Sequence, residues 1–139
     1  LPRAELARAL KALGHRFPNT RAAFIAENQR LRADLQQTLR CFSSGAKARE
    51  WLVENVKGFG YKEASHFLRN TGHMDVAIID RHILRFLVKE GLIEEPKSLT
   101  RSRYLSLERL LRGIATELGI SLSELDLYLW YMMTGKVLK

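Results

Sequence analysis

The apolar residues of this chain recur at helical spacing, and few residues interrupt the pattern. Only three prolines and nine glycines punctuate 139 residues, and the segments between them carry apolar side chains three and four positions apart rather than at alternate positions. The first such segment places Leu6, Leu10 and Leu13 on one helical face. Gly14 then follows as a stop signal. The sequence therefore predicts an all-α fold of about seven helices.

The later helices are delimited by local start and stop signals. Ser121 and Glu124 have the S-x-x-E spacing of a capping box, and Asp80 is placed as an N-cap. Segment 75–80 is the only plausible strand, but it has no pairing partner, so we interpret it as a buried extended connector. Segment 94–98 is the best linker candidate. Helices are expected from Asn19, around 35–42, around 48–56, from 61 to Gly72, between Asp80 and Gly91, around 107–118, and from Ser121 to Gly135.

The charge balance favours a polyanionic partner. The formal net charge is +8, from 23 Lys and Arg against 15 Asp and Glu, which suits nucleic acid or an anionic membrane surface. The basic residues are dispersed over several helices rather than gathered on one amphipathic face, so a membrane surface is the weaker alternative. The lone Cys41 and four histidines without an i, i+4 pair argue against a disulfide framework, an iron–sulfur cluster and a catalytic zinc. The single cysteine also makes a reducing, intracellular setting the default. No apolar run approaches the roughly 20 residues of a membrane span, so we expect a soluble protein.

A glycine-rich turn separates two predicted helices. Gly58-Phe59-Gly60 ends one helix, and Tyr61 opens the next. Glycine lets the backbone approach a phosphate closely, and the first-turn amides of the following helix are donors for an anion. The alternative is a plain helix–helix turn in which glycine serves as a C-cap.

Lys62 and Asp80 are the candidates for chemistry. Lys62 lies in the first helical turn, where the helix dipole disfavours a cation and relatively favours the nucleophilic neutral amine. Asp80 follows an apolar run that should anchor its backbone, and its carboxylate could stabilise positive charge developing on a sugar ring. The alternatives are a solvated surface lysine and an aspartate that only caps a helix.

These residues carry a resemblance to a known superfamily. Segment 56–70, with Gly58-x-Gly60-x-Lys62, and segment 77–83, with Asp80, resemble the helix-hairpin-helix DNA glycosylases. The closest similarity is to the type-2 8-oxoguanine DNA glycosylase/AP lyases of prokaryotes, and it extends from about Leu6 to Lys139. It implies one glycosylase domain over 1–139, with the hairpin and catalytic aspartate in 45–91 and the C-terminal helices in 99–139. The chain is short for that family, so an N-terminal helical segment is expected to be missing.

The resemblance also implies the roles of individual residues. Lys62 would attack C1′ of the damaged nucleoside and form a Schiff base, and Asp80 would support that reaction. No cofactor is required, but a structural Na⁺ or K⁺ ion is implied at the hairpin. The further implied residues are a base pocket of Asp126, Trp130 and Lys139, DNA contacts by Arg16, Phe17, Gly58, Phe59 and Gly60, and a cation site on the backbone carbonyls of Glu54, Val56 and Phe59.

Several of these roles have a simpler alternative. Asp126 and Trp130 stand four residues apart on the last predicted helix and so share a face, but Trp130 could equally be core packing. Phe17 could serve as a wedge beside a flipped base, or it could pack the next helix into the core. Lys139 could be a solvated chain end.

The function implied is base excision repair. The expected partner is double-stranded DNA containing 8-oxoguanine, bound by a monomer in a prokaryotic cytoplasm. The enzyme would remove the base through a lysine Schiff base and cleave the strand by β-elimination. The alternatives are a glycosylase/lyase of the same superfamily for another oxidised base, and a helix-hairpin-helix module that binds DNA without catalysis.

Overall fold

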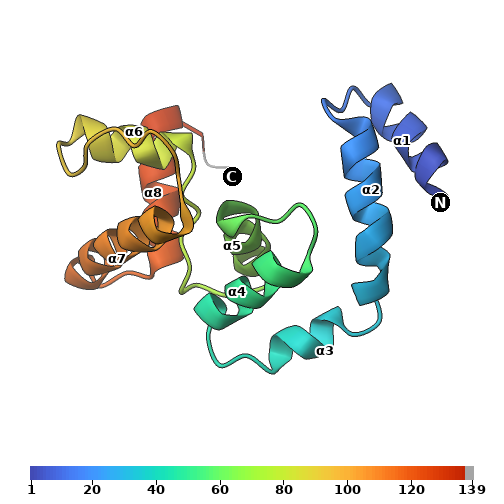
Figure 1. Cartoon of the computed structure of the whole chain (residues 1–139). Helices are drawn as coiled ribbons and strands as arrows, with labels where there is room; N and C mark the ends of the chain where they lie inside the picture. The colour runs from blue at the N-terminus through green and yellow to red at the C-terminus, as the bar shows by residue number, and fades with distance from the viewer. Residues whose placement is uncertain (137–139) are drawn as a thin grey trace.

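The computed structural model describes residues 1–136, and the regular secondary structure in this part of the chain is all helical (Figure 1). The predicted all-α class is confirmed, with eight α-helices where about seven were expected, and a short 3₁₀-helix that the sequence did not indicate. Their bounds are α1 (Arg3–Ala12), α2 (Pro18–Asn28), η1 (Gln29–Leu31), α3 (Leu35–Arg40), α4 (Gly45–Asn55), α5 (Tyr61–Asn70), α6 (Arg81–Lys89), α7 (Arg101–Leu118) and α8 (Leu122–Thr134).

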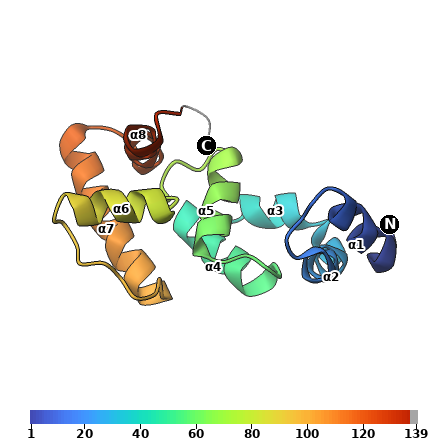
Figure 2. The same cartoon turned by 90° about the horizontal axis from the view of Figure 1, so that it is seen from above.

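The helices form three groups along the molecule. Figures 1 and 2 both place α1 and α2 at one end, α4 and α5 in the middle, and α6, α7 and α8 at the other end. The pairs α1 with α2, α4 with α5, α6 with α8 and α7 with α8 pack against each other. Helix α3 connects the first group to the second (Figure 1).

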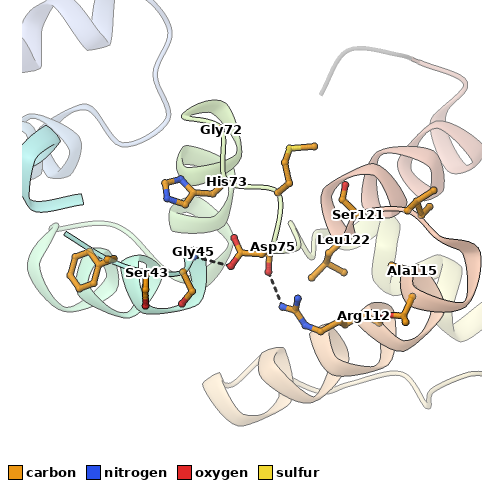
Figure 3. Close-up of a pocket in the computed structure, with 14 residues that line it drawn as sticks. Ser43, Gly45, Gly72, His73, Asp75, Arg112, Ala115, Ser121 and Leu122 are labelled. Atoms are coloured by element: carbon orange, nitrogen blue, oxygen red, sulfur yellow. Dashed lines mark hydrogen bonds between the residues drawn. The ribbon is translucent and has the colours of Figure 1, made fainter. Parts of the chain in front are cut away.

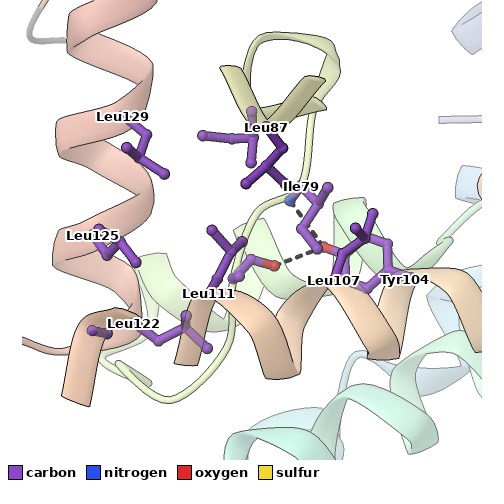
Figure 4. Close-up of a cluster of buried hydrophobic side chains, with 11 residues drawn as sticks. Ile79, Leu87, Tyr104, Leu107, Leu111, Leu122, Leu125 and Leu129 are labelled. Carbon is purple, nitrogen blue, oxygen red and sulfur yellow. Dashed lines mark hydrogen bonds between the residues drawn. The ribbon is translucent and has the colours of Figure 1, made fainter. Parts of the chain in front are cut away.

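Two hydrophobic clusters underlie this arrangement. The smaller cluster lies among α3, α4 and α5, and its buried members are Leu39, Ala48, Leu52, Ala64, Leu68 and Val76. The larger cluster lies among α6, α7 and α8, and Figure 4 shows its buried side chains, which include Ile79, Leu87, Tyr104, Leu107, Leu111, Leu122, Leu125 and Leu129. The two clusters meet at residues 76 and 77 of the connector. The linker candidate 94–98 instead joins α6 to α7, which belong to the same cluster.

The segment before Asp80 is the buried extended connector that the sequence predicted. Val76 and Ala77 are fully buried, and Ile78 and Ile79 are 1% exposed. This segment has no strand pairing in the described residues. A buried backbone amide or carbonyl is costly without a hydrogen-bond partner. Groups outside the connector must therefore bind the amides and carbonyls of its backbone.

Side chains of α7 supply partners at residues 77 and 79. The Tyr104 hydroxyl donates to the Ala77 carbonyl at 2.6 Å and accepts the Ile79 amide at 3.1 Å (Figure 4). The Glu108 carboxylate accepts the Ala77 amide at 2.9 Å. These bonds replace the ladder of a sheet and fix the backbone that leads into Asp80.

Side chains of α8 bind the connector backbone at residues 76 and 78. The Asp126 carboxylate accepts the Ile78 amide at 2.8 Å, and the Ser123 hydroxyl donates to the Val76 carbonyl at 3.2 Å. The connector is therefore held from both α7 and α8.

The beginning of the connector is tied to two further helices. Asp75 accepts the Gly45 amide of α4 at 2.8 Å on its carboxylate and the Arg112 guanidinium of α7 at 2.7 Å on its carbonyl (Figure 3). These contacts lie at a pocket of about 520 Å³. The connector is thus held at both of its ends.

Candidate active site

The turn between α4 and α5 depends on glycine at residue 58. Gly58 has a φ of +85°, in the left-handed region where side chains are rare. A Cβ built at this position would lie 2.5 Å from Cδ2 of Phe24, a residue of α2. Both the backbone angle and the neighbouring ring therefore require the absence of a side chain.

The segment after Phe24 also holds the hairpin. The side chain of Asn28 pairs with the backbone of Lys57, accepting its amide at 2.8 Å and donating to its carbonyl at 2.9 Å. The Arg30 guanidinium donates to the Asn55 carbonyl at 2.9 Å. The C-terminal end of α4 is thus capped by side chains from α2 and η1 rather than by water alone.

Two hairpin amides are engaged within the chain. The Phe59 amide donates to the Val56 carbonyl at 3.2 Å, and the Gly60 amide donates to the Glu63 carboxylate at 3.1 Å. The family resemblance implies DNA contacts by Phe59 and Gly60, whereas the sequence predicted the first-turn amides of the following helix as the donors for a phosphate. The amides of Tyr61 and Lys62, in the first turn of α5, have no acceptor within their own helix, so they are the better-placed donors for an anion.

Lys62 lies where the sequence predicted, as the second residue of α5. Its side chain is exposed. An exposed amine at the start of a helix that follows a tight turn is accessible to a ligand as large as a nucleic-acid strand.

Asp80 is the N-cap of α6, as predicted. Its Oδ1 atom accepts the His82 amide at 2.9 Å and the Ile83 amide at 3.0 Å. Because one oxygen makes both cap bonds, the cap does not require Oδ2. Asp80 is half-buried, so this carboxylate can cap the helix and still face a ligand.

Two tyrosines connect the start of α5 with the residue before Asp80. Tyr61, next to Lys62, has its ring 5.5 Å from the ring of Tyr104. The Tyr104 hydroxyl holds the amide of Ile79, and Asp80 follows directly. The structure thereby brings the two predicted catalytic residues onto neighbouring helix starts.

A buried ion pair lies beneath these rings. The Arg49 guanidinium donates to both carboxylate oxygens of Glu108, at 2.5 and 2.7 Å, and to the Ser65 hydroxyl at 3.1 Å. It lies 5.4 Å from the Tyr61 ring centroid and 5.5 Å from that of Tyr104. Burial opposes the charge of Arg49, but the Glu108 carboxylate outweighs it and raises the pKa of the guanidinium.

The two tyrosine hydroxyls differ in their surroundings. Burial raises the pKa of Tyr104 to about 12, against the opposing bond from the Ile79 amide. Tyr61 instead donates to Glu50 at 2.7 Å and accepts from Arg101 at 2.6 Å. Burial and the bond to Glu50 raise the pKa of Tyr61, while Arg101 lowers it.

Two of the three predicted base-pocket residues, Asp126 and Trp130, lie beside the start of α6. Asp126 is fully buried, and its carboxylate accepts from Arg69 at 2.6 Å and from the Ile78 amide. Trp130 is half-buried against the larger cluster, and its ring meets the His82 ring edge-on at 6.3 Å between centroids. Trp130 therefore contacts His82, the residue whose amide binds the Asp80 carboxylate. Lys139 lies outside the described residues.

Arg16 and Phe17 lie at the far end of α2 from the hairpin. The Arg16 guanidinium stacks 5.0 Å from the Phe17 ring centroid. Phe17 is 53% exposed, so it does not pack into the core as the alternative supposed. Helix α2 separates Phe17 from Asn28 by about 16 Å at 1.5 Å per residue, and the structure does not bring this pair to Lys62 and Asp80.

A side-chain metal site is absent from the described residues. Within residues 1–136, no group of three or more His, Cys, Asp or Glu is placed to hold a metal ion. The Val56 carbonyl, one of the three predicted cation ligands, already accepts the Phe59 amide. It can accept a second partner because a carbonyl oxygen has two lone pairs. The Glu54 carbonyl belongs to the last turn of α4, where carbonyls lack helical partners.

The sequence interpretation missed Arg49, Tyr104 and Glu108. A signal for them was present: Glu108 is four residues after Tyr104 and three before Leu111, on the apolar face of its helix. Arg49 is likewise among the buried residues of α4, three residues before Leu52. Opposite charges on two apolar helix faces indicate a buried pair.

Fold and site together define a helix-hairpin-helix protein of the DNA glycosylase class. The family described as 8-oxoguanine DNA glycosylase matches residues 1–120. The chain belongs to this family. No helix within residues 1–136 is long and apolar enough to cross a membrane.

Relatives with assigned activities share this similarity over nearly the whole chain. The 8-oxoguanine DNA glycosylase/AP lyase of Korarchaeum cryptofilum is 57% identical over 136 residues, covering 97% of this chain and 65% of the relative. That of Methanocaldococcus jannaschii is 55% identical over 140 residues, covering 100% and 67%. The chain thus spans about two thirds of the length of these relatives.

Solved structures agree with the sequence comparisons. The crystal structure of the Methanocaldococcus jannaschii 8-oxoguanine glycosylase/lyase in complex with a 15mer DNA containing 8-oxoguanine is 54% identical, with a TM-score of 0.94 over 100% of this chain and 67% of that one. The 8-oxoguanine DNA glycosylase of Thermotoga maritima is 49% identical, with a TM-score of 0.89 over 100% and 66%.

Proposed function

We propose that this protein removes 8-oxoguanine from duplex DNA and cleaves the strand at the resulting abasic site. The observation that carries the proposal is the placement of Lys62 and Asp80 at neighbouring helix starts, linked through Tyr61 and Tyr104. Family membership supports the substrate, since relatives 57% and 55% identical are 8-oxoguanine DNA glycosylase/AP lyases.

Lys62 is the nucleophile of the proposed reaction. Its neutral Nζ attacks C1′, and the bond from C1′ to the base breaks, so the base leaves with the electron pair. The departing base takes up one proton from Nζ. The nitrogen lone pair then breaks the ring C1′–O4′ bond, O4′ takes up the second Nζ proton as a hydroxyl, and an imine forms between Nζ and C1′. Loss of a C2′ proton breaks the C3′–O bond by β-elimination, and water releases the lysine.

Asp80 supports the sugar rather than attacking it. Positive charge develops at C1′ and O4′ as the base leaves, and a fixed carboxylate stabilises this charge without reorganising. The cap bonds to His82 and Ile83 hold Oδ1 in place. Oδ2 is then the oxygen directed to the sugar.

The rest of the site supports DNA binding. Backbone donors at the start of α5 and the net charge of +8 suit the phosphates of a duplex. A flipped base is held by stacking and hydrogen bonds. We assign the stacking to the half-buried Trp130, and we propose that Asp126, which is fully buried, shapes the base pocket through the Ile78 amide that it holds. We further propose a Na⁺ or K⁺ ion on the Glu54, Val56 and Phe59 carbonyls, and a monomer acting in a prokaryotic cytoplasm.

Borohydride trapping tests the proposal. Sodium borohydride reduces an imine to a stable amine, so the chain incubated with an 8-oxoguanine duplex should form a covalent adduct that Lys62→Gln abolishes. Lys47→Gln is the matched control, because Lys47 is also a first-turn lysine, in α4, away from the hairpin. DNA binding without an adduct would favour a non-catalytic module, and a stronger adduct with an oxidised pyrimidine would favour another lesion.

A further inference from the structure

One buried residue contacts both halves of the candidate active site. Tyr104, on α7, is 2% exposed and so cannot itself reach DNA. We propose that Tyr104 is a positioning residue that fixes the Asp80 carboxylate relative to Lys62 through the backbone of residues 77–79. This proposal rests on the proposed function of Lys62 and Asp80.

The hydroxyl of Tyr104 holds the connector at two points. It donates to the Ala77 carbonyl at 2.6 Å and accepts the Ile79 amide at 3.1 Å. These are the third and first residues before Asp80. Fixing both of them sets the position and direction from which the Asp80 side chain departs.

The ring of Tyr104 is held against α5. It lies 5.5 Å from the ring of Tyr61, the residue before Lys62. The Arg49 guanidinium lies against both rings and is itself paired in two hydrogen bonds to Glu108. The Ser65 hydroxyl of α5 is 3.4 Å from that of Tyr104. A shift of this ring therefore displaces the start of α5 as well.

The hydroxyl can be removed with little change in the ring. Tyr104→Phe keeps the contacts with Tyr61 and Arg49 but leaves the Ala77 carbonyl and the Ile79 amide without these partners in a buried site. The connector must then shift to satisfy them. Because catalytic groups must be held close to their productive geometry, a small displacement of Asp80 lowers the rate of base removal.

A double-mutant cycle on base removal tests this role. Under single-turnover conditions with a saturating 8-oxoguanine duplex, Tyr104→Phe should slow excision about 10- to 100-fold, with DNA affinity nearly unchanged. In an Asp80→Asn background the same substitution should slow excision by no more than about twofold. Equal losses in both backgrounds would overturn the proposal, since Tyr104 would then act independently of Asp80.

A control separates positioning from loss of stability. Leu39→Ala removes a core side chain of the smaller cluster, on α3. It should lower the stability at least as much as Tyr104→Phe while leaving the saturated excision rate within about twofold. A comparable loss of rate in both variants would show that Tyr104 acts only through stability.

Amide exchange tests the same role without activity. The amides of His82 and Ile83 donate the two hydrogen bonds of the Asp80 cap, so their hydrogen exchange reports on the position of the Asp80 carboxylate. In Tyr104→Phe their hydrogen exchange should accelerate about 10-fold relative to other α6 amides, and unchanged protection would overturn the proposal. If the unmodified chain excised no base, the proposed function would fail, while this measurement would still decide whether Tyr104 positions Asp80.

Discussion

At the scale of single residues, the helix-capping role of Asp80 can be separated from its proposed chemical role. Asp80→Ser keeps an oxygen that can accept from the His82 and Ile83 amides, so the stability should change by only a few tenths of a kcal/mol. Asp80→Ala removes the cap and should cost about 1 kcal/mol. Urea unfolding measures the difference between the two variants.

The same two variants should be equally impaired in base removal, because both lack the carboxylate. We expect a loss of about 100-fold or more in single-turnover rate for each. A nearly normal rate in Asp80→Ser would show that the residue only caps α6.

The Arg49–Glu108 pair should show the asymmetry of buried charges. Glu108→Ala leaves a guanidinium buried without its partner, and we expect a loss of about 3–5 kcal/mol in the free energy of unfolding. The double variant Arg49→Met/Glu108→Leu should recover part of this loss, because no unpaired charge remains. Recovery should be incomplete, since the Ala77 amide still loses its acceptor, at about 1–3 kcal/mol.

Urea unfolding should rank the double variant between Glu108→Ala and the unmodified chain in free energy of unfolding. A double variant less stable than Glu108→Ala would contradict the view that the unpaired charge is the main cost.

At the scale of elements, the hairpin is shaped by its neighbour as well as by its own sequence. Gly58→Ala should destabilise the protein by two effects: a positive φ, costing roughly 1 kcal/mol, and contact with the Phe24 ring. Gly14→Ala is the matched control, because Gly14 has a φ of +76° but no atom within 4 Å of a built Cβ.

The difference in stability loss between Gly58→Ala and Gly14→Ala measures the cost of the contact with the Phe24 ring. We expect Gly58→Ala to lose more stability in thermal unfolding than Gly14→Ala, and Phe24→Leu to reduce the excess. Equal losses in the two alanine variants would mean that Phe24 yields without cost.

The elements also show what the sequence could and could not predict. Helix ends were predictable because their signals are local: Asp80 caps α6, Ser121 with Glu124 caps α8, and Gly119 ends α7 with a φ of +68°. The buried connector was predictable from its apolar run. Its binding partners were not, because Tyr104 and Asp126 lie 25 and 48 residues from the amides they accept.

In the candidate site, too, local features were predictable from the sequence and long-range contacts were not. Lys62 and Asp80 became candidates because local signals predicted each at a helix start, and the structure places both there. Their spatial relation was not predictable, since it depends on the packing of Tyr61 on Tyr104 between two helices distant in sequence. The distance of Phe17 from the hairpin depends likewise on the direction of α2, which no local signal gives.

At the scale of the whole molecule, the network around Tyr104 joins the two hydrophobic clusters and should make stability depend on alkaline pH. The folded pKa of Tyr104 is about 12, against an ordinary value of 10.0. Between these values the unfolded chain loses the phenolic proton while the folded chain keeps it, so the free energy of unfolding falls as pH rises. Below about pH 10, Tyr104 keeps its proton in both states, so its full contribution to the free energy of unfolding is present.

The expected loss between pH 10 and 12 is about 2–3 kcal/mol from this residue, since each unit of pKa is worth about 1.4 kcal/mol. Urea unfolding across this range should show a steeper decline for the unmodified chain than for Tyr104→Phe, which cannot ionise. Tyr128→Phe, which removes a hydroxyl from a side chain 59% exposed on α8, should retain the full decline. If the free energy of unfolding of Tyr104→Phe fell as steeply with pH as that of the unmodified chain, the link between the clusters would not depend on a neutral Tyr104 hydroxyl.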